Sequence, residues 1–500
     1  MTLFHLTKRS YDSRRPTGSP AAHLDGEMGV SRLAPTLRKG LQADAAVATR
    51  LRRVCGETLV VGCGQALAVA GAVVGVRLLT GALSPVVYGE LALANTIAAL
   101  ISMVATGGIG NAASRFFAPA RDKGEVRAYL RSTAYLYALT HLAVCAITVP
   151  LVAYLAVRGP EKWAKLAGVA LLLAALWGAG GILDAIQNAA RQRSVVALHQ
   201  AAGQWLRFLG AVFLVRWLGA KSTNALYGYT AAAGLVLASQ FLFYRIRIWP
   251  LAVRETSAQN DDPRQMASEM WAFGWPFAAW GAIGWLQQAS DRWILAAVVD
   301  VREVGLYQAL NQVGYYPVTL LAGLIAQVMA PILFALAGDG TDPVRAGRAR
   351  RAVNALAALT FAVTLAATAL CSIMHGRVFS LVVAAEYRAV SGLLPLVVLG
   401  SGLFATGQML AYHSLVQINS RALLAPKIGS GVLAVALNYL GARSSGLMGV
   451  VCAGVGSSGF YALWVYILSR SQDQRHWARA GLSTGGAAAT TERPGLGAVQ

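Results

Sequence analysis

Long uncharged apolar stretches recur along this chain, and they constrain its fold more than any other feature. A helix needs about 20 mainly apolar residues to cross the hydrocarbon core of a bilayer. Hydrophobic residues make up 56% of the sequence and charged residues 13%, which excludes an ordinary soluble protein. We predict an all-α polytopic membrane protein with twelve spans, near residues 58–80, 91–113, 132–156, 166–188, 195–217, 222–244, 271–299, 306–336, 352–375, 389–414, 424–441 and 446–468.

An adjacent acid and base, Asp291 and Arg292, lie inside the seventh predicted span, after the uncharged residues 270–290. An ionisable side chain at the centre of a membrane helix costs roughly 2.5–3.5 kcal/mol on insertion scales, so such a pair normally faces a helix bundle or a watery cavity. We interpret Asp291 as a structural partner that balances the charge of Arg292. A role in ligand binding or ion coupling is the alternative.

The basic residues predict the orientation of the chain in the membrane. Of the 43 Lys and Arg, 31 lie in the two tails and on alternate loops, and eight lie on the opposite loops. Cytoplasmic loops carry the excess of positive charge, so both termini are predicted to be cytoplasmic. The net charge of +21 is the result of this distribution, because the basic residues lie between the spans and not on one patch. Nucleic acid is therefore not a predicted partner.

Hydrophilic segments divide the chain into five parts. Residues 1–56 are predicted to be a basic, disordered cytoplasmic tail. Residues 57–244 form a first six-helix lobe, and residues 245–269 form a cytoplasmic linker with an Asn-Asp-Asp-Pro run. Residues 270–469 form a second six-helix lobe, and residues 470–500 are predicted to be a disordered cytoplasmic tail.

The two halves contain a faint internal repeat. Identical residues recur 215 to 218 positions apart at equivalent places: Gly89 with Gly305, Asn95 with Asn311, Arg77 with Arg292, and Val126-Arg127-Ala128 with Val344-Arg345-Ala346. Together these pairs indicate a duplication of six helices, which is common among transporters.

The sequence carries no signature of an enzyme or of a metal site. The five cysteines lie in or beside apolar segments without CxxC spacing, so neither a disulfide framework nor a metal site is predicted. We also find no paired-carboxylate motif and no phosphate-binding glycine loop. No cofactor is expected, and we predict that the protein is not an enzyme.

Two short motifs stand at equivalent places of the halves. They are Leu83-Ser84-Pro85-Val86-Val87-Tyr88-Gly89-Glu90, and Ser290-Asp291-Arg292-Trp293-Ile294-Leu295 followed by Glu303-Val304-Gly305-Leu306-Tyr307. Together they resemble the polysaccharide-transporter branch of the MOP superfamily, the Wzx-type oligosaccharide flippases. The resemblance covers about residues 57–470.

This resemblance implies two six-helix lobes around a central cavity that opens alternately to either side of a bacterial inner membrane. The implied cargo is an oligosaccharide on polyprenyl diphosphate, flipped from the cytoplasmic to the outer leaflet for surface polysaccharide biosynthesis. Membrane lipids, a coupling ion (H⁺ or Na⁺) and polysaccharide polymerase machinery are the implied partners.

Such a cargo needs fixed positive charge on its path, because its diphosphate is anionic and a guanidinium binds phosphate with two parallel hydrogen bonds. The candidate cavity cations are Arg207, Arg292 and Arg77. For Arg207 the alternative is a structural ion pair. For Arg77 and Arg292 the alternative is that the side chain reaches the membrane interface.

Asp184 lies near the end of the fourth predicted span, on one helix face with Gln187, Asn188 and Arg191. It is a candidate ion-coupling carboxylate or part of an inward vestibule. The alternative is the polar end of a helix that satisfies its own hydrogen bonds.

Two other functions stay open at this point. A multidrug and toxin extruder of the same superfamily is the nearest alternative, but its cationic cargo favours acidic cavities, whereas the spans hold four Arg and two Asp. A non-transporting membrane assembly protein would not explain why charges lie inside the spans.

Overall fold

The structure is a computed structural model that describes residues 62–253, 263–338, 343–417 and 420–488, of which 331, 343, 420 and 472–488 are described by their backbone alone. The described residues are almost entirely helical and include no strand, which confirms the predicted all-α class. The tail predicted for residues 1–56 and the middle of the predicted linker lie outside the described residues.

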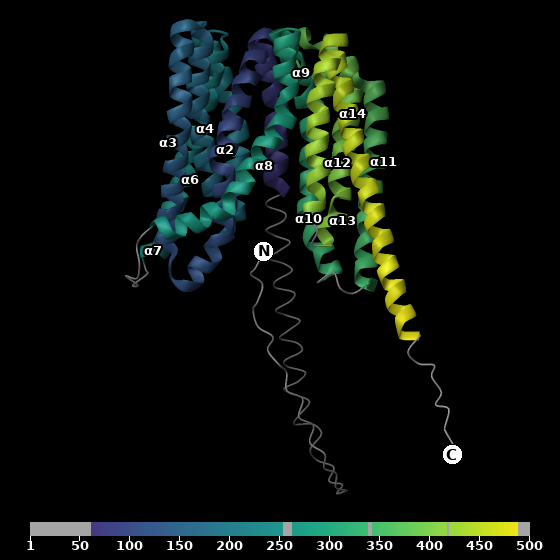
Figure 1. Ribbon diagram of the computed structural model, residues 1–500. Coiled ribbons are helices and arrows are strands. Elements are labelled where there is room, and N and C mark those ends of the chain that lie inside the picture. The colour runs from purple at the N-terminus through teal and green to yellow at the C-terminus, as the bar shows by residue number, and fades with distance from the viewer. Residues whose placement is uncertain (1–61, 254–262, 339–342, 418–419, 489–500) are drawn as a thin grey trace, which may run out of the picture. The chain divides into compact units, whose positions relative to one another are not determined.

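The N-terminal half (residues 62–253) consists of long helices joined by short turns (Figure 1). They are a first helix Gly62–Ala82, then α2 (Pro85–Lys123), α3 (Val126–Arg158), α4 (Glu161–Ala189), α5 (Arg193–Leu218), α6 (Ser222–Arg247) and the short α7 (Trp249–Val253). Pro85 occupies the first turn of α2, where its missing N–H has no helical partner to lose. The predicted turn Ser84-Pro85 therefore separates the first two spans.

The C-terminal half (residues 263–488) has more interrupted helices. They are α8 (Pro263–Val298), α9 (Val301–Leu310), a π-helical turn (Asn311–Tyr315), α10 (Tyr316–Ala337), α11 (Pro343–Val382), a 3₁₀ segment (Ala385–Leu393), α12 (Leu394–Leu410), α13 (Tyr412–Val416), a 3₁₀ turn (Ser420–Leu423) and α14 (Leu424–Ala488). Asp300 caps α9 by accepting the Glu303 N–H at 2.8 Å. Within α14, Gly446 has φ 58°, so two helices meet there.

The described helices match the predicted spans. Nine of them are long and apolar enough to cross a membrane. Two more spans, α5 and α8, carry Arg207 and the Asp291–Arg292 pair, and α14 counts twice because it breaks at Gly446. The chain is therefore a multi-pass membrane protein, and its described helices are compatible with the twelve predicted spans.

Helices extend beyond the predicted spans into the predicted linker and into the predicted C-terminal tail. The predicted linker 245–269 contains the end of α6, all of α7 and the first residues of α8, which begins at Pro263. The tail predicted to be disordered begins at residue 470, whereas α14 continues to Ala488. Polar residues in these segments fit a helix that leaves the membrane, so hydropathy alone gave helices that are too short.

At one end of the bundle the two halves are in close contact, and we call this contact the seam. It consists of Arg77, Thr80, Leu83 and Gly89 from the N-terminal half and Gly305, Val383, Ala384 and Tyr387 from the C-terminal half. The Tyr387 hydroxyl donates to the Leu83 carbonyl at 2.8 Å, and the Ala384 N–H donates to the Thr80 hydroxyl at 3.1 Å. Most of these bonds end on backbone atoms, so they depend on close approach of the helices.

Helix α8, the first helix of the C-terminal half, packs against the N-terminal half as well as against its own half. In Figure 1 it runs from beside α3 and α7 to beside α9. Near its start, Met270 is buried in a cluster with Phe117 of α2 and Tyr129 of α3. Further along, the Trp285 indole donates to the Thr96 carbonyl at 2.7 Å. The beginning of α8 therefore packs with the N-terminal half, although it follows the linker in sequence.

Candidate functional site

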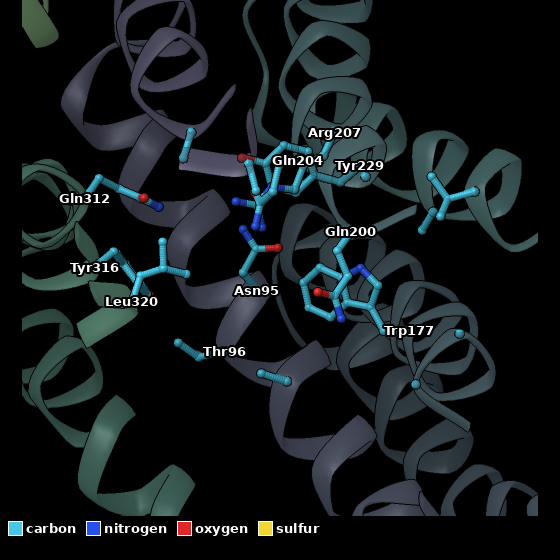
Figure 2. A pocket seen from close by; sticks show the side chains of 18 of the residues that line it. Asn95, Thr96, Trp177, Gln200, Gln204, Arg207, Tyr229, Gln312, Tyr316 and Leu320 are labelled. Atoms are coloured by element: carbon cyan, nitrogen blue, oxygen red, sulfur yellow. The ribbon is translucent and has the colours of Figure 1, made fainter. Parts of the chain in front are cut away.

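A cavity of about 830 Å³ lies between the two halves. The first helix and α2, α4, α5 and α6 line one side, and α8, α9 and α10 line the other. Figure 2 shows Gln204 and Arg207 on the first side and Gln312 and Tyr316 on the second. The polar lining consists mainly of amides and aromatic rings, with three formal charges: Asp184, Arg207 and Arg292.

Arg207 projects from the middle of α5 into this cavity, next to Gln204 and Asn95 (Figure 2). Its guanidinium carbon lies 4.6 Å from the centre of the Phe208 ring and 5.4 Å from that of Tyr229. It makes no ion pair or hydrogen bond to any described side chain or backbone group, and its Nε is buried. Aromatic faces attract the cation but leave its hydrogen-bond donors free for a ligand.

Arg292 also lines the cavity, but its Nε and one of its terminal nitrogens already have protein partners. Its Nε donates to Gln308 at 2.9 Å, and one terminal nitrogen donates to the Gln288 carbonyl at 2.7 Å. The same nitrogen lies 3.2 Å from the Asp291 carboxylate, whose other oxygen accepts the Tyr307 hydroxyl at 2.7 Å. Asp291 and Arg292 therefore form an ion pair in this structure.

A small second pocket of about 110 Å³ lies behind this pair, inside the C-terminal half. Asp291, Arg292 and Tyr307 line it together with Asn311 and Asn438. The α8–α9 network thus separates the main cavity from a smaller polar space. Sequence reasoning singled out Asn311 as a repeat position without indicating this pocket.

Arg77, the third candidate cavity cation, is not among the residues that line the cavity. Its guanidinium donates to the Val383 carbonyl at the seam. The difference is its position along the first helix: the cavity-lining residues of that helix are Gln65, Ala68, Val69, Ala72 and Val73, all at least one turn earlier. Arg77 therefore ties the two halves together.

Asp184 lies at the end of the cavity opposite the seam, where α4 and α6 end and α5 begins. Gln240 donates to one carboxylate oxygen at 2.6 Å, and Gln200 donates to the other at 3.2 Å. The Gln200 carbonyl oxygen accepts a hydrogen bond from Gln65 at 3.2 Å. The predicted partners Gln187, Asn188 and Arg191 are not among the cavity-lining residues. Asp184 therefore belongs to an amide network between helices.

Sequence reasoning missed several lining residues. Asn95 was noted for its repeat spacing, and its Oδ1 is buried without a hydrogen-bond partner among the described residues. Trp177 gave no signal, because a tryptophan in an apolar span is most often a packing or interfacial residue. Within the described ranges, no cluster of His, Cys, Asp and Glu could hold a metal ion.

The geometry suits an elongated ligand with an anionic group. An open guanidinium lies in the middle of the cavity, and amides and aromatic rings line the rest. Because the surroundings are partly buried, a charge-assisted hydrogen bond to Arg207 is stronger than it would be in water.

Comparison with solved structures shows the same fold in membrane transporters. The lipid II flippase MurJ in an inward closed conformation matches with a TM-score of 0.63 at 11% identity, over 83% of this chain and 87% of MurJ. A multidrug resistance MATE family transporter of the MOP superfamily matches in its inward-facing conformation with a TM-score of 0.58 at 16% identity, over 82% of this chain and 94% of that one. At these identities the likeness concerns the fold alone.

Comparison of sequences identifies the family. No curated protein matches the chain. The profile of a family described as "Polysaccharide biosynthesis protein" matches residues 54–337, which include both motifs and most of the cavity-lining residues. The resemblance to the polysaccharide-transporter branch of the MOP superfamily is confirmed. The chain belongs to the polysaccharide biosynthesis protein family and has the fold of MOP-superfamily transporters.

Proposed function

We propose that this protein is a flippase that moves an oligosaccharide on polyprenyl diphosphate from the cytoplasmic to the outer leaflet of a bacterial inner membrane. The observation that carries the proposal is the Arg207 guanidinium, which faces the cavity without a hydrogen-bond partner among the described residues. A diphosphate would supply the acceptors that this guanidinium lacks.

The family and the fold support this cargo class. The family description names polysaccharide biosynthesis, and one structure with the same fold is a lipid II flippase. A multidrug extruder shares the fold, but a cavity whose unpaired charge is a guanidinium disfavours cationic cargo. The lipid-linked anion is therefore the better match.

The position of the seam supports alternating access. Seam residues belong to loops and helix ends that carry few Lys and Arg, so the charge rule places the seam at the outer face. The cavity is then closed to the outside by the seam. Transport would require the seam to separate, and a coupling ion and a polymerase complex are further proposed partners.

Complementation of a deletion strain tests the proposal. Arg207→Ala should abolish surface polysaccharide at normal protein abundance, with lipid-linked precursor accumulating in the inner leaflet. Arg207→Lys should retain part of the export, because the charge remains while the planar fork is lost. The matched control is Arg216→Ala, which removes an exposed guanidinium near the end of the same helix, outside the cavity lining. Full export by Arg207→Ala would refute the proposed site.

A further inference from the structure

One face of α4 forms an open slot at the end of the cavity opposite the seam. Trp177, Gly180, Gly181 and Asp184 follow the spacing i, i+3, i+4 and i+7, and all four line the cavity. The two glycines place no side chain between the indole ring and the carboxylate, although a Cβ at Gly180 would lie 3.2 Å from the Gln240 Oε1. A Cβ placed at Gly181 would meet no atom within 4 Å. We call this face, with Gln200 beside it, the α4 slot.

Hydrogen bonds hold the polar wall of the α4 slot in place. Asp184 accepts from Gln240 at 2.6 Å and from Gln200 at 3.2 Å. Each carboxylate oxygen has a further lone pair, and each primary amide has a second N–H. The wall therefore presents fixed donors and acceptors side by side, which suits neighbouring hydroxyl groups that both donate and accept.

We propose that the α4 slot binds sugar rings of the cargo. A pyranose ring has an apolar C–H face and a rim of hydroxyls, so it is recognised by an aromatic plane together with orienting polar groups. Trp177 supplies the plane, and Asp184 and Gln200 supply the polar groups. The diphosphate is excluded from this end, because the formal charge there is a carboxylate.

The spacing along α5 connects the α4 slot to the anion site. Gln200 and Arg207 are seven residues apart on this helix, a rise of about 10.5 Å. Both side chains line the same cavity. A diphosphate at Arg207 can therefore place the sugars attached to it against the α4 slot. This inference rests on the proposed function and adds the location and chemistry of the sugar subsite.

Binding to the full-length protein in nanodiscs separates the two sites. One probe is undecaprenyl diphosphate, and the other is the lipid-linked oligosaccharide extracted from the deletion strain. Gly181→Leu should weaken binding of the sugar-bearing probe at least about tenfold, because a leucine side chain would fill the slot. Its affinity for undecaprenyl diphosphate should stay within about twofold of the wild-type value. Leucine is a better helix former than glycine, so this variant should fold. Gly376→Leu is the matched control, at an exposed position of α11 outside the cavity lining.

A second pair of variants tests the aromatic plane. Trp177→Ala should lower the affinity for the sugar-bearing probe by about threefold to tenfold, which is the contribution of one aromatic contact. Trp177→Phe keeps an aromatic ring and should bind this probe with nearly wild-type affinity. Arg207→Ala should weaken the binding of both probes.

If Gly181→Leu leaves the binding of the sugar-bearing probe unaffected, or if it weakens the binding of both probes equally, the proposed sugar subsite is wrong. If Arg207→Ala binds both probes with wild-type affinity, the proposed diphosphate site at Arg207 is wrong, independently of the sugar subsite. Wild-type protein that binds neither probe would overturn the proposed function and the subsite with it.

Discussion

Gly89 and Gly305, which are 216 residues apart at equivalent places of the two halves, lie with their backbones in direct contact. A Cβ added to Gly89 would lie 2.9 Å from the Gly305 nitrogen and 2.1 Å from the Val301 carbonyl oxygen. A Cβ at Gly305 would lie 1.8 Å from the Pro85 carbonyl oxygen. The repeat thus marks the place where the two halves touch, and only glycine permits the closed seam.

Gly305→Ala should open the seam. The clash is with backbone atoms, which cannot move aside as a flexible side chain would, so the closed state loses stability relative to open states. Spin labels at Lys221 and Arg302, both exposed near the seam end, should report longer distances, and export should fall. Gly81→Ala is the control, because a Cβ there meets no atom within 4 Å. An unchanged distance distribution in Gly305→Ala would show that the seam tolerates a side chain.

Arg77→Gln should weaken the seam without weakening cargo binding. The shorter amide loses the charged hydrogen bond to the Val383 carbonyl, and such bonds contribute about 1.5–3 kcal/mol. The closed population should fall roughly 10- to 150-fold relative to open states. Affinity for undecaprenyl diphosphate should stay at the wild-type value, because Arg77 does not line the cavity.

Arg443→Gln provides the comparison for Arg77, since it removes an exposed guanidinium that contacts Tyr439 of its own helix. It should affect neither the spin-label distances nor binding. A loss of diphosphate affinity in Arg77→Gln alone would return Arg77 to the list of cargo-binding residues.

Removing one member of the Asp291–Arg292 pair should harm folding more than removing both. Arg292→Gln leaves a largely buried carboxylate that keeps the Tyr307 hydroxyl as its donor side chain among the described residues, and breaking a buried pair costs about 3–5 kcal/mol. Asp291→Asn leaves the guanidinium similarly uncompensated. The double variant should recover membrane abundance, measured by quantitative immunoblotting of membranes. Equal abundance of all three variants would show that the pair does not stabilise the fold.

Thiol labelling checks the orientation of the chain. In a cysteine-free background, a cysteine at Lys221 or Arg388 should react with a membrane-impermeant maleimide from outside intact cells. A cysteine at Arg193 or Arg348 should react only after the membrane is permeabilised, because the excess of Lys and Arg predicts a cytoplasmic location. The opposite labelling pattern would place the seam at the cytoplasmic face.

The sequence by itself determined the class of fold and the positions of the spans. Apolar runs with few charges must become membrane helices, because backbone groups in hydrocarbon have to satisfy their hydrogen bonds within the segment. Even the spans with unfavourable charges could be predicted. Asp291 and Arg292 indicated each other as partners, because two adjacent opposite charges inside a span have few other ways to be stabilised.

Only the tertiary structure decided which polar side chains share the cavity. Arg77 and Arg207 are both cations inside spans, yet one ties the seam and the other faces the cavity without a partner. Trp177 and Gln200 come from different helices, and nothing local in the chain indicates that both line one cavity. The face of a membrane helix that meets a cavity depends on how the helices pack, because hydropathy shows that a helix is buried in lipid or protein but not which neighbour covers each side.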